Sequence, residues 1–243
     1  MMRGVLAAIG FLTRIPVPLH VFDDADAKSR SLAWYPLVGL LIGIILAALA
    51  WLLREQSSLL SGIVLLVAWV VLTGAMHLDG LADSSDAWVG GLGDRERTLR
   101  IMKDPRCGPV GVVALVLVLM LKGAALASLP PAQWVGLLLV PMLARAVLTA
   151  AFVSTRYVRA EGLGSALVDA PRAACWSALA LVCMACLLVA GWHGLWILLA
   201  TAVMFGLWRR ACMRRLGGMT GDTCGALTEL VEAVVLTVWV VTA

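Results

Sequence analysis

Residues 63–86 read IVLLVAWVVLTGAM and then HLDGLADSSD, so an apolar run passes directly into a segment with three aspartates. If the two parts form one continuing helix, Asp79, Asp83 and Asp86 stand at positions i, i+4 and i+7. At about 3.6 residues per turn, these positions fall within about 60° of one another around the helix axis. The sequence therefore predicts three carboxylates on one helix face, at the point where an apolar span meets water.

Such a carboxylate face calls for a cation, because neighbouring like charges raise one another's pKa. Magnesium is the expected ion, since it prefers oxygen ligands, takes one or two carboxylates and keeps positions for water and substrate phosphate. The alternative interpretation is a solvated acidic end of a helix that holds no metal. Acidic groups beside a membrane span are typical of functional sites, and for this reason we favour metal binding.

The composition indicates an integral membrane protein. The chain has 243 residues, of which 62% are hydrophobic and only 14% are charged, far from the balance of a soluble domain. Residues 1–243 therefore form one expected membrane domain. The six cysteines show no paired framework. Lys and Arg do not cluster with aromatic residues, so nucleic acid is not expected as a partner; the lipid bilayer is, and the oligomeric state, a homo-oligomer included, stays open.

The apolar runs predict an all-α bundle of about seven transmembrane helices. A shorter run at residues 4–12 precedes Arg14 and the sequence IPVP, and we interpret it as an interfacial or re-entrant segment. Gly39 and Gly43 have the spacing that allows two helices to approach closely. The predicted spans are residues 36–53, 59–76, 109–129, 134–153, 173–190, 195–208 and 224–240.

The distribution of basic residues tests this topology. With seven spans, 16 of the 19 Lys and Arg residues fall on one side, in the segments 3–30, 95–106, 156–172 and 209–215. Arg54 is the basic residue on the other side, and the remaining two lie within spans. Since positive charge is retained in the cytoplasm, the amino terminus is expected inside, the carboxyl terminus outside, and the aspartate segment on the cytoplasmic face.

A second acidic set lies at the start of the last span and within it. Glu229 follows Asp222 by seven residues, which places it on the same helix face and about 10 Å deeper; Glu232 follows one turn later. Ionisable groups at such depth are usually paired or line a wet cavity. Lys122 and Arg145 are their natural partners, and the alternative to a functional role is a structural ion pair between helices.

Four basic residues on the aspartate side suit phosphate binding: Lys103, Arg106, Arg156 and Arg159. An arginine fork matches phosphate oxygens in two-point contacts, and lysine supplies a point charge. For the four arginines of residues 209–215, the ordinary role of fixing the topology is favoured.

His77 projects about 160° away from the aspartate face of the predicted helix. It is either a general base or an interfacial hydrogen-bonding residue. Carboxylates that hold magnesium among cations at a membrane surface suit a nucleophilic attack on a diphosphate. Neither a phosphate-binding loop of the Walker type nor a dinucleotide fingerprint is present.

Six stretches in chain order resemble the cobalamin synthase family, the adenosylcobinamide-GDP ribazoletransferases. They are FLTRIPVP at 11–18, YPLVG at 35–39, HLDGLADSSD at 77–86, RIMKD at 100–104, EGLG at 161–164 and GGMTGDT at 217–223. The resemblance implies that α-ribazole or its 5′-phosphate attacks the cobinamide-side phosphorus of adenosylcobinamide-GDP and releases GMP, with magnesium present. It also implies a multi-pass protein of the bacterial cytoplasmic (inner) membrane, with its active site facing the cytoplasm.

The resemblance also implies roles for particular residues. The candidate metal ligands are Asp79, Asp83, Asp86, Asp222 and Glu229. The candidate substrate-binding residues are Lys103, Asp104, Arg106, Lys122, Arg145, Arg156 and Arg159. The candidate catalytic residues are His77, Asp79, Asp83 and Asp86; whether His77 or a free aspartate accepts the ribazole proton stays open.

Three alternatives are kept. Another magnesium-dependent membrane transferase, either a phosphatidyltransferase or a prenyltransferase, uses the same electrostatics on a diphosphate. A prenyltransferase should carry a second aspartate-rich loop, which the Gly-Asp-Thr block is not. A divalent-cation transporter would use Glu229, Glu232 and Arg145 along its pathway. It should have acidic residues on both faces, whereas the outer face here has Glu55 alone.

Overall fold

The computed structural model describes residues 2–159 and 164–242, and these residues are largely helical, with no β-strand among them. The all-α prediction is confirmed. The helices are α1 (Met2–Leu12), α2 (Ala25–Ser31), α3 (Tyr35–Leu52), α4 (Ser58–Thr73), α5 (Met76–Gly90), α6 (Arg95–Ile101), α7 (Pro109–Ala127), α8 (Val135–Ser154), α9 (Arg172–Leu216) and α10 (Gly221–Thr242).

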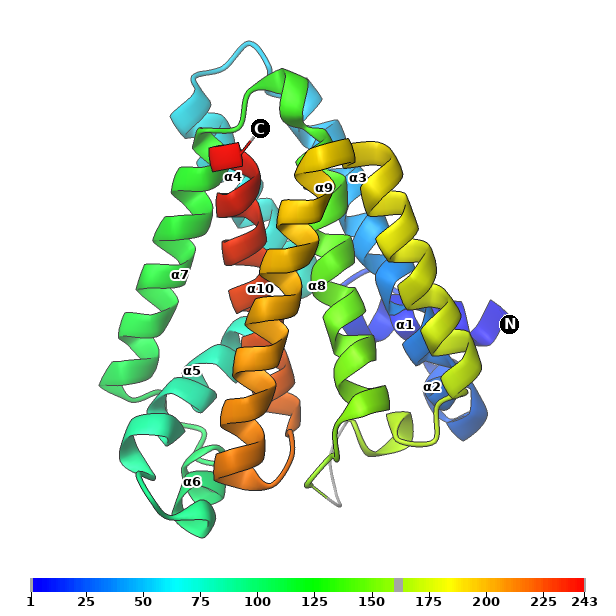
Figure 1. Cartoon of the computed structure of the whole chain (residues 1–243), viewed down its shortest axis with the longest axis vertical. Coiled ribbons are helices and arrows are strands. Elements are labelled where there is room, and N and C mark those ends of the chain that lie inside the picture. The colour runs from blue at the N-terminus through cyan, green and yellow to red at the C-terminus, as the bar shows by residue number, and fades with distance from the viewer. Residues whose placement is uncertain (1, 160–163, 243) are drawn as a thin grey trace.

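The long helices form a membrane bundle (Figure 1). Five helical segments of the described chain are long and apolar enough to cross a membrane, and the bent pair of α4 and α5 adds a sixth. The 45 residues of α9 would measure about 68 Å when straight, more than twice the apolar thickness of a bilayer. Gly191 breaks α9, with φ 53° and ψ −126°, into two arms that form an inverted V (Figure 1). This break falls where the sequence separates the fifth and sixth predicted spans, so seven apolar segments result.

The aspartate segment is helical, but it does not continue the preceding span. α4 ends at Thr73, α5 begins at Met76, and the two axes differ in direction by 89°. Gly74 and Ala75 between them adopt the left-handed conformation, with φ of 65° and 58°. The prediction of one continuing helix is therefore wrong. Two left-handed residues reverse the backbone twist, so no α-helix can pass through them.

The segment that follows α1 holds this break in place. The backbone N–H of Arg14 donates to the Leu72 carbonyl oxygen at 2.8 Å, and its guanidinium donates to the Gly74 carbonyl oxygen at 3.4 Å. A Cβ on Gly74 would overlap the Arg14 side chain. The end of α4 thus finds partners for its last carbonyl groups, and α5 starts in a new direction beside α6 (Figure 1).

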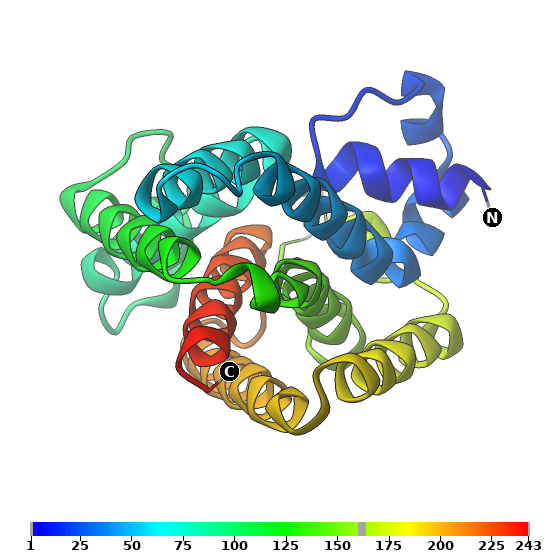
Figure 2. The same cartoon turned by 90° about the horizontal axis from the view of Figure 1, so that it is seen from above.

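The amino-terminal helix differs from the spans in direction. Figure 2 looks down the bundle and shows α1 from the side, whereas α8 is seen nearly end-on. α1 is only 11 residues long, too short to cross a bilayer. It lies across the bundle direction, as expected of an interfacial segment.

The predicted close approach at Gly39 and Gly43 is confirmed. A Cβ on either glycine would overlap the backbone of α8, at Pro141 and Leu137 respectively. α3 and α8 therefore pack backbone to backbone at the centre of the bundle, in the way small residues allow in membranes.

Candidate active site

The aspartate helix α5 is held against the start of α10 by glycines at their crossing. A Cβ on Gly80 would lie 2.7 Å from the Asp222 carbonyl oxygen, and one on Gly225 would lie 3.2 Å from the His77 carbonyl oxygen. A Cβ at Gly80 would overlap the α10 backbone and one at Gly225 would make a tight contact with α5, so the two backbones meet there. The crossing brings Asp222 beside the aspartate helix, where the family resemblance implied it would lie.

The carboxylates at this crossing repel one another. Asp83 is partly buried and lies near the Asp79 and Asp222 carboxylates, whose charges repel its own. Arg159 is a positive charge nearby but does not offset the crowding. A further positive charge at this position would keep Asp83 ionised.

Arg159 reaches the site through a short backbone pairing between two loops. Val158 donates its N–H to the Met219 carbonyl oxygen at 2.9 Å, and Tyr157 pairs with Met219 in an isolated parallel bridge. The Arg159 guanidinium then lies 2.7 Å from the Asp222 carboxylate, and both side chains are less than 20% exposed. Arg159 and Asp222, distant in sequence, therefore lie side by side.

Asp86 faces a different neighbour. Its two carboxylate oxygens accept the backbone N–H groups of Gly108 at 2.7 Å and Gly111 at 2.9 Å. Gly108 is the residue that precedes the first turn of α7, so Asp86 caps that helix. The structure engages Asp86 as a cap, away from the role of metal ligand that the sequence predicted.

Lys122, Arg145, Glu229 and Glu232 form a buried cluster in the bundle core. The Lys122 ammonium lies 2.9 Å from Glu229 and 2.5 Å from Glu232, and Arg145 pairs with the other oxygen of Glu232. All four are at most 3% exposed. The cluster joins α7, α8 and α10, as the structural alternative predicted. The predicted roles of Glu229 as metal ligand and of Lys122 and Arg145 as substrate contacts find no support, because these charges neutralise one another below the site.

A cavity of about 310 Å³ opens between α5, α10 and the loop that carries Arg159. Asp79, Arg159 and Asp222 line its more exposed part. The deeper wall is apolar and aromatic, with Tyr35 and Leu148 almost fully buried.

His77 also lines this cavity and is 3% exposed. Its Nδ1 is buried and has no hydrogen-bond partner among the described residues. The imidazole lies between the cavity and the buried cluster, near enough to feel the charges of Arg145 and Glu232. Asp79, two residues further along α5, lines the same cavity.

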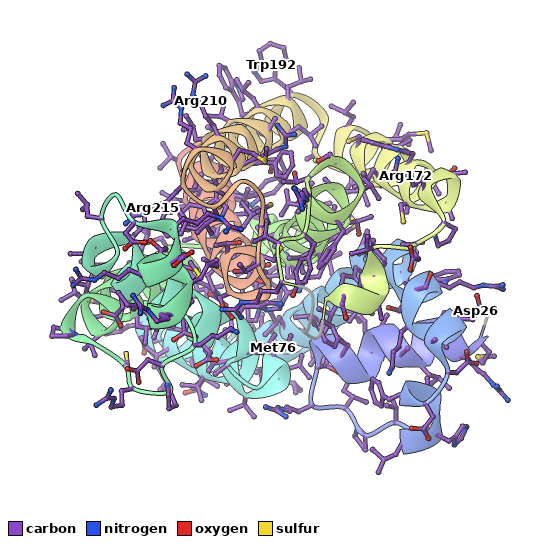
Figure 3. The ribbon with its side chains drawn as sticks, turned by 90° about the horizontal axis from the view of Figure 1, so that it is seen from below. Asp26, Met76, Arg172, Trp192, Arg210 and Arg215 are labelled. Atoms are coloured by element: carbon purple, nitrogen blue, oxygen red, sulfur yellow. The ribbon has the colours of Figure 1, made fainter. Side chains whose placement is uncertain are left out.

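The other predicted cations lie outside this cavity. Arg106 forms a two-point ion pair with Asp104 across their shared turn, and this pairing lowers the pKa of Asp104 to about 2. Lys103 and Arg156 are exposed. Figure 3 views this end of the molecule, with Met76 near the centre of the view and Arg172 and Arg210 further out. Lys103, Arg106 and Arg156 are not among the residues that line the cavity.

Two carboxylates fit a magnesium ion. In the described ranges, no three His, Cys, Asp or Glu side chains lie close enough to hold a metal by themselves. Asp79 and Asp83 stand one helical turn apart and have no ion pair or hydrogen bond to a described side chain. Magnesium commonly takes one or two carboxylates and completes its shell with water and substrate phosphate, and this donor set matches that habit.

Several site residues escaped the sequence interpretation. Phe152 and Tyr157 line the cavity, but aromatic residues near the end of a predicted span look like ordinary core positions. Gly80 lies inside the aspartate block, and a glycine within a helical segment is a signal of close backbone packing. Of the EGLG stretch, residues 161–163 lie outside the described residues, and Gly164 lines the cavity.

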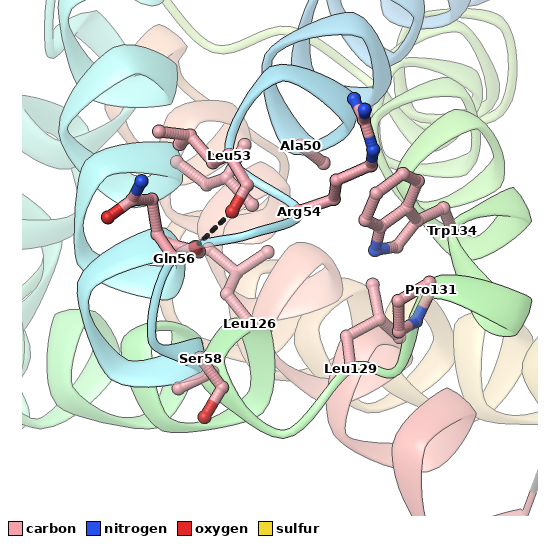
Figure 4. A pocket seen from close by; sticks show the side chains of 12 residues that line it. Ala50, Leu53, Arg54, Gln56, Ser58, Leu126, Leu129, Pro131 and Trp134 are labelled. Carbon is pink, nitrogen blue, oxygen red and sulfur yellow. Dashed lines mark hydrogen bonds between the residues drawn. The ribbon is translucent and has the colours of Figure 1, made fainter.

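A second cavity, of about 100 Å³, lies at the opposite end of the bundle (Figure 4). Arg54, Gln56 and Trp134 line it, and none of its lining residues is acidic. It therefore offers no carboxylate site.

Comparisons with known proteins show the family to which the chain belongs. A family model described as cobalamin-5-phosphate synthase matches residues 4–240. A protein of Pseudomonas fluorescens named adenosylcobinamide-GDP ribazoletransferase is 53% identical over 231 residues, which cover 94% of this chain and 95% of that protein. Proteins of the same name from Stutzerimonas stutzeri and Pseudomonas aeruginosa are 53% and 50% identical, each over 97% of this chain and 96% of their own length. No solved structure matches. The chain belongs to the cobalamin-5-phosphate synthase family.

Proposed function

We propose that this chain is an adenosylcobinamide-GDP ribazoletransferase whose reaction takes place at the rim formed by Asp79, Asp83, Arg159 and Asp222. A hydroxyl oxygen of α-ribazole, or of its 5′-phosphate, forms a bond to the cobinamide-side phosphorus. The phosphoanhydride bond to GMP breaks, and the hydroxyl proton passes to a base. The observation that carries the proposal is the meeting of these carboxylates with an arginine beside a cavity, in a chain whose relatives bear this name.

Magnesium is the proposed cofactor, with Asp79 and Asp83 as its protein ligands. When bound, it would neutralise the diphosphate and the charge that develops on the leaving GMP. Asp222 is held by Arg159 and would orient water in the metal's shell. The carboxylates would thereby position a substrate that is itself anionic.

The proposed roles of the cations differ according to how buried each side chain is. Arg159 is less than 20% exposed and would make a two-point contact with a phosphate oxygen pair. Lys103 and Arg156 are exposed and would attract the nucleotide from solution, a long-range effect that salt screens. Arg106 is already paired with Asp104 and serves the turn before α7.

Two groups are proposed to accept the ribazole proton. One is His77, which lines the cavity from its deeper side, and the other is an aspartate of the rim that the metal leaves free. A His77→Asn variant that keeps its turnover would leave a rim aspartate as the base.

The proposed setting is the bacterial cytoplasmic membrane, with the site on the cytoplasmic side. The basic segments of the sequence flank this end of the bundle, and Arg54 is at the other, as the positive-inside rule expects. The nucleotide-activated substrate and its magnesium are then supplied from the cytoplasm.

The test is release of GMP by purified protein in detergent, with adenosylcobinamide-GDP, α-ribazole and magnesium. We expect GMP to appear only when both substrates are present, and to disappear when the metal is chelated. Glu55→Gln, which removes an exposed acid at the far end of the bundle, should match the wild type. Wild-type protein that releases no GMP from either form of ribazole would overturn the proposal.

A further inference from the structure

We infer that the cavity beneath the rim binds the flat, two-ring base of the acceptor nucleoside, and that Phe152, Tyr157, Tyr35 and His77 are the residues that recognise it. This inference rests on the proposed function and deepens it. It assigns the acceptor, rather than the corrinoid or the guanine nucleotide, to the apolar part of the site.

The cavity wall becomes more buried from its rim inward. Asp79 is exposed, and the Arg159 and Asp222 side chains are 18% and 19% exposed. Tyr35 and His77 are 1% and 3% exposed. The cavity therefore has a charged rim and an aromatic interior, and a ligand that fills it must be apolar at one end and polar at the other. α-Ribazole, which is a benzimidazole riboside, has an apolar base at one end and a polar ribose at the other.

The interior wall of the cavity is aromatic. Phe152 and Tyr157 are stacked, with ring centroids 5.6 Å apart and planes 26° from parallel. Phe11 and Tyr35 form a second stacked pair, with centroids 6.0 Å apart and planes at 18°. All four rings line the cavity. Aromatic rings of this kind bind flat bases by stacking, without base-specific hydrogen bonds.

The cavity wall also contains a buried polar atom that the described residues leave without a hydrogen-bond partner. Nδ1 of His77 has no hydrogen-bond partner among the described residues, although His77 lines the cavity. Buried polar atoms are nearly always satisfied in native proteins, and an orphan calls for an explanation. The unsubstituted ring nitrogen of a benzimidazole riboside would supply the missing hydrogen bond.

The volume of the cavity limits what it can hold. A cavity of about 310 Å³ lies at the lower end of the range for small-molecule sites, which suits a two-ring base. A corrinoid is far larger and must stay outside. With the base inside, the ribose hydroxyl would emerge at the rim beside Asp79 and Asp222, where the diphosphate is attacked.

Gly164 lies against both rings of the stacked pair and lines the cavity with them. A Cβ at this position would lie 2.9 Å from the ring atoms of both Phe152 and Tyr157. Since something must shift at such a distance, Gly164→Ala would displace the stacked pair or place its methyl group in the cavity. The wall can therefore be changed in two ways, by shortening a ring or by displacing it.

The experiment measures KM for α-ribazole and for adenosylcobinamide-GDP separately, by GMP release. Phe152→Leu should raise KM for α-ribazole about tenfold, as expected for loss of one stacking ring, and leave KM for the corrinoid within about twofold. Phe205→Leu, the same change on the second arm of α9, is the matched control and should change neither. Gly164→Ala should also raise KM for α-ribazole alone, and its elution from a sizing column shows whether it is folded.

A second measurement needs no turnover. Equilibrium dialysis of α-ribazole against the wild type and the Phe152→Leu protein, without corrinoid or metal, should show about tenfold weaker binding by the variant. The riboside of imidazole, which has one ring, should bind the wild type more weakly than α-ribazole by a similar factor.

The outcomes separate the two proposals. If the wild type releases no GMP, the proposed function fails, and dialysis still tests the cavity for a flat base. If the wild type releases GMP but Phe152→Leu and Phe205→Leu have the same KM for α-ribazole, the inference is overturned. It is also overturned if Phe152→Leu raises KM for the corrinoid instead.

Discussion

The carboxylate of Asp86 accepts the backbone N–H of Gly108 at 2.7 Å, and this contact joins the aspartate helix to the start of α7. Asp86 shares a helix face with Asp79 and Asp83 in the sequence pattern, yet its partner is a helix end. The turn before α7 carries Lys103 and Arg106, so Asp86 also fixes the position of these cations beside the site.

Asp86→Asn should therefore act on stability more than on the metal. An amide offers one acceptor where the carboxylate offers two, and loss of a helix cap costs about 0.5–2 kcal/mol. We expect a lower unfolding temperature in detergent, with the magnesium concentration for half-maximal GMP release little changed. A large increase in that magnesium concentration, without loss of stability, would instead indicate that Asp86 is a metal ligand.

Asp83→Asn should show the opposite behaviour. It removes a carboxylate that has no hydrogen-bond or ion-pair partner among the described residues and is crowded by Asp79 and Asp222, so the unfolding temperature should stay the same or rise. GMP release should fall at least about tenfold, because a metal ligand is lost. Titration with magnesium and with manganese measures the effect; unchanged metal dependence would contradict it.

Glu232→Gln should strongly destabilise the bundle. Glu232 accepts from Lys122 and Arg145 while fully buried, and its loss leaves unbalanced positive charge in the core. Removing one partner of such a network typically costs about 3–5 kcal/mol. Thermal unfolding followed by circular dichroism measures this. The double variant Glu232→Gln, Lys122→Met restores the charge balance and should recover part of the loss; no recovery would mean that the charges are not coupled.

Gly80→Ala should separate the two halves of the site. A Cβ there would lie 2.7 Å from the Asp222 carbonyl oxygen, so α5 and α10 must move apart and the carboxylates with them. We expect kcat for GMP release to fall at least about tenfold, since small displacements at a reacting centre cost that much. Gly206→Ala is the control, because a Cβ at Gly206 meets nothing within 4 Å. Equal activity of the two variants would rule out a required crossing.

Ala75→Gly should stabilise the break between α4 and α5. Ala75 has φ 58°, a conformation that costs an L-residue roughly 1–2 kcal/mol and glycine almost nothing. Part of that gain is offset by the greater freedom of glycine in the unfolded chain, so a rise of about 1 kcal/mol is expected. Gly74→Ala should destabilise, because the added Cβ meets Arg14. Unfolding midpoints of the two variants test both signs.

Much of the fold follows from local sequence. Apolar runs must become helices in a membrane, because each helix satisfies its own backbone hydrogen bonds. The break of the long α9 at Gly191 was visible as a short glycine-containing interruption. The pairing of deep glutamates with Lys122 and Arg145 followed from the cost of an unpaired charge in an apolar core, and the structure confirms it.

The site itself divides differently between sequence and tertiary structure. Sequence alone determined that Asp79 and Asp83 share a helix face, because that depends only on the turn of the helix. Tertiary structure decided that Asp86 caps α7, that Arg159 joins Asp222, and that aromatic rings close a cavity between them. These outcomes depend on which backbones meet at Gly80 and where the chain turns at Gly74. Contacts between segments far apart in the chain leave no periodic trace in the sequence, so only the packed structure reveals them.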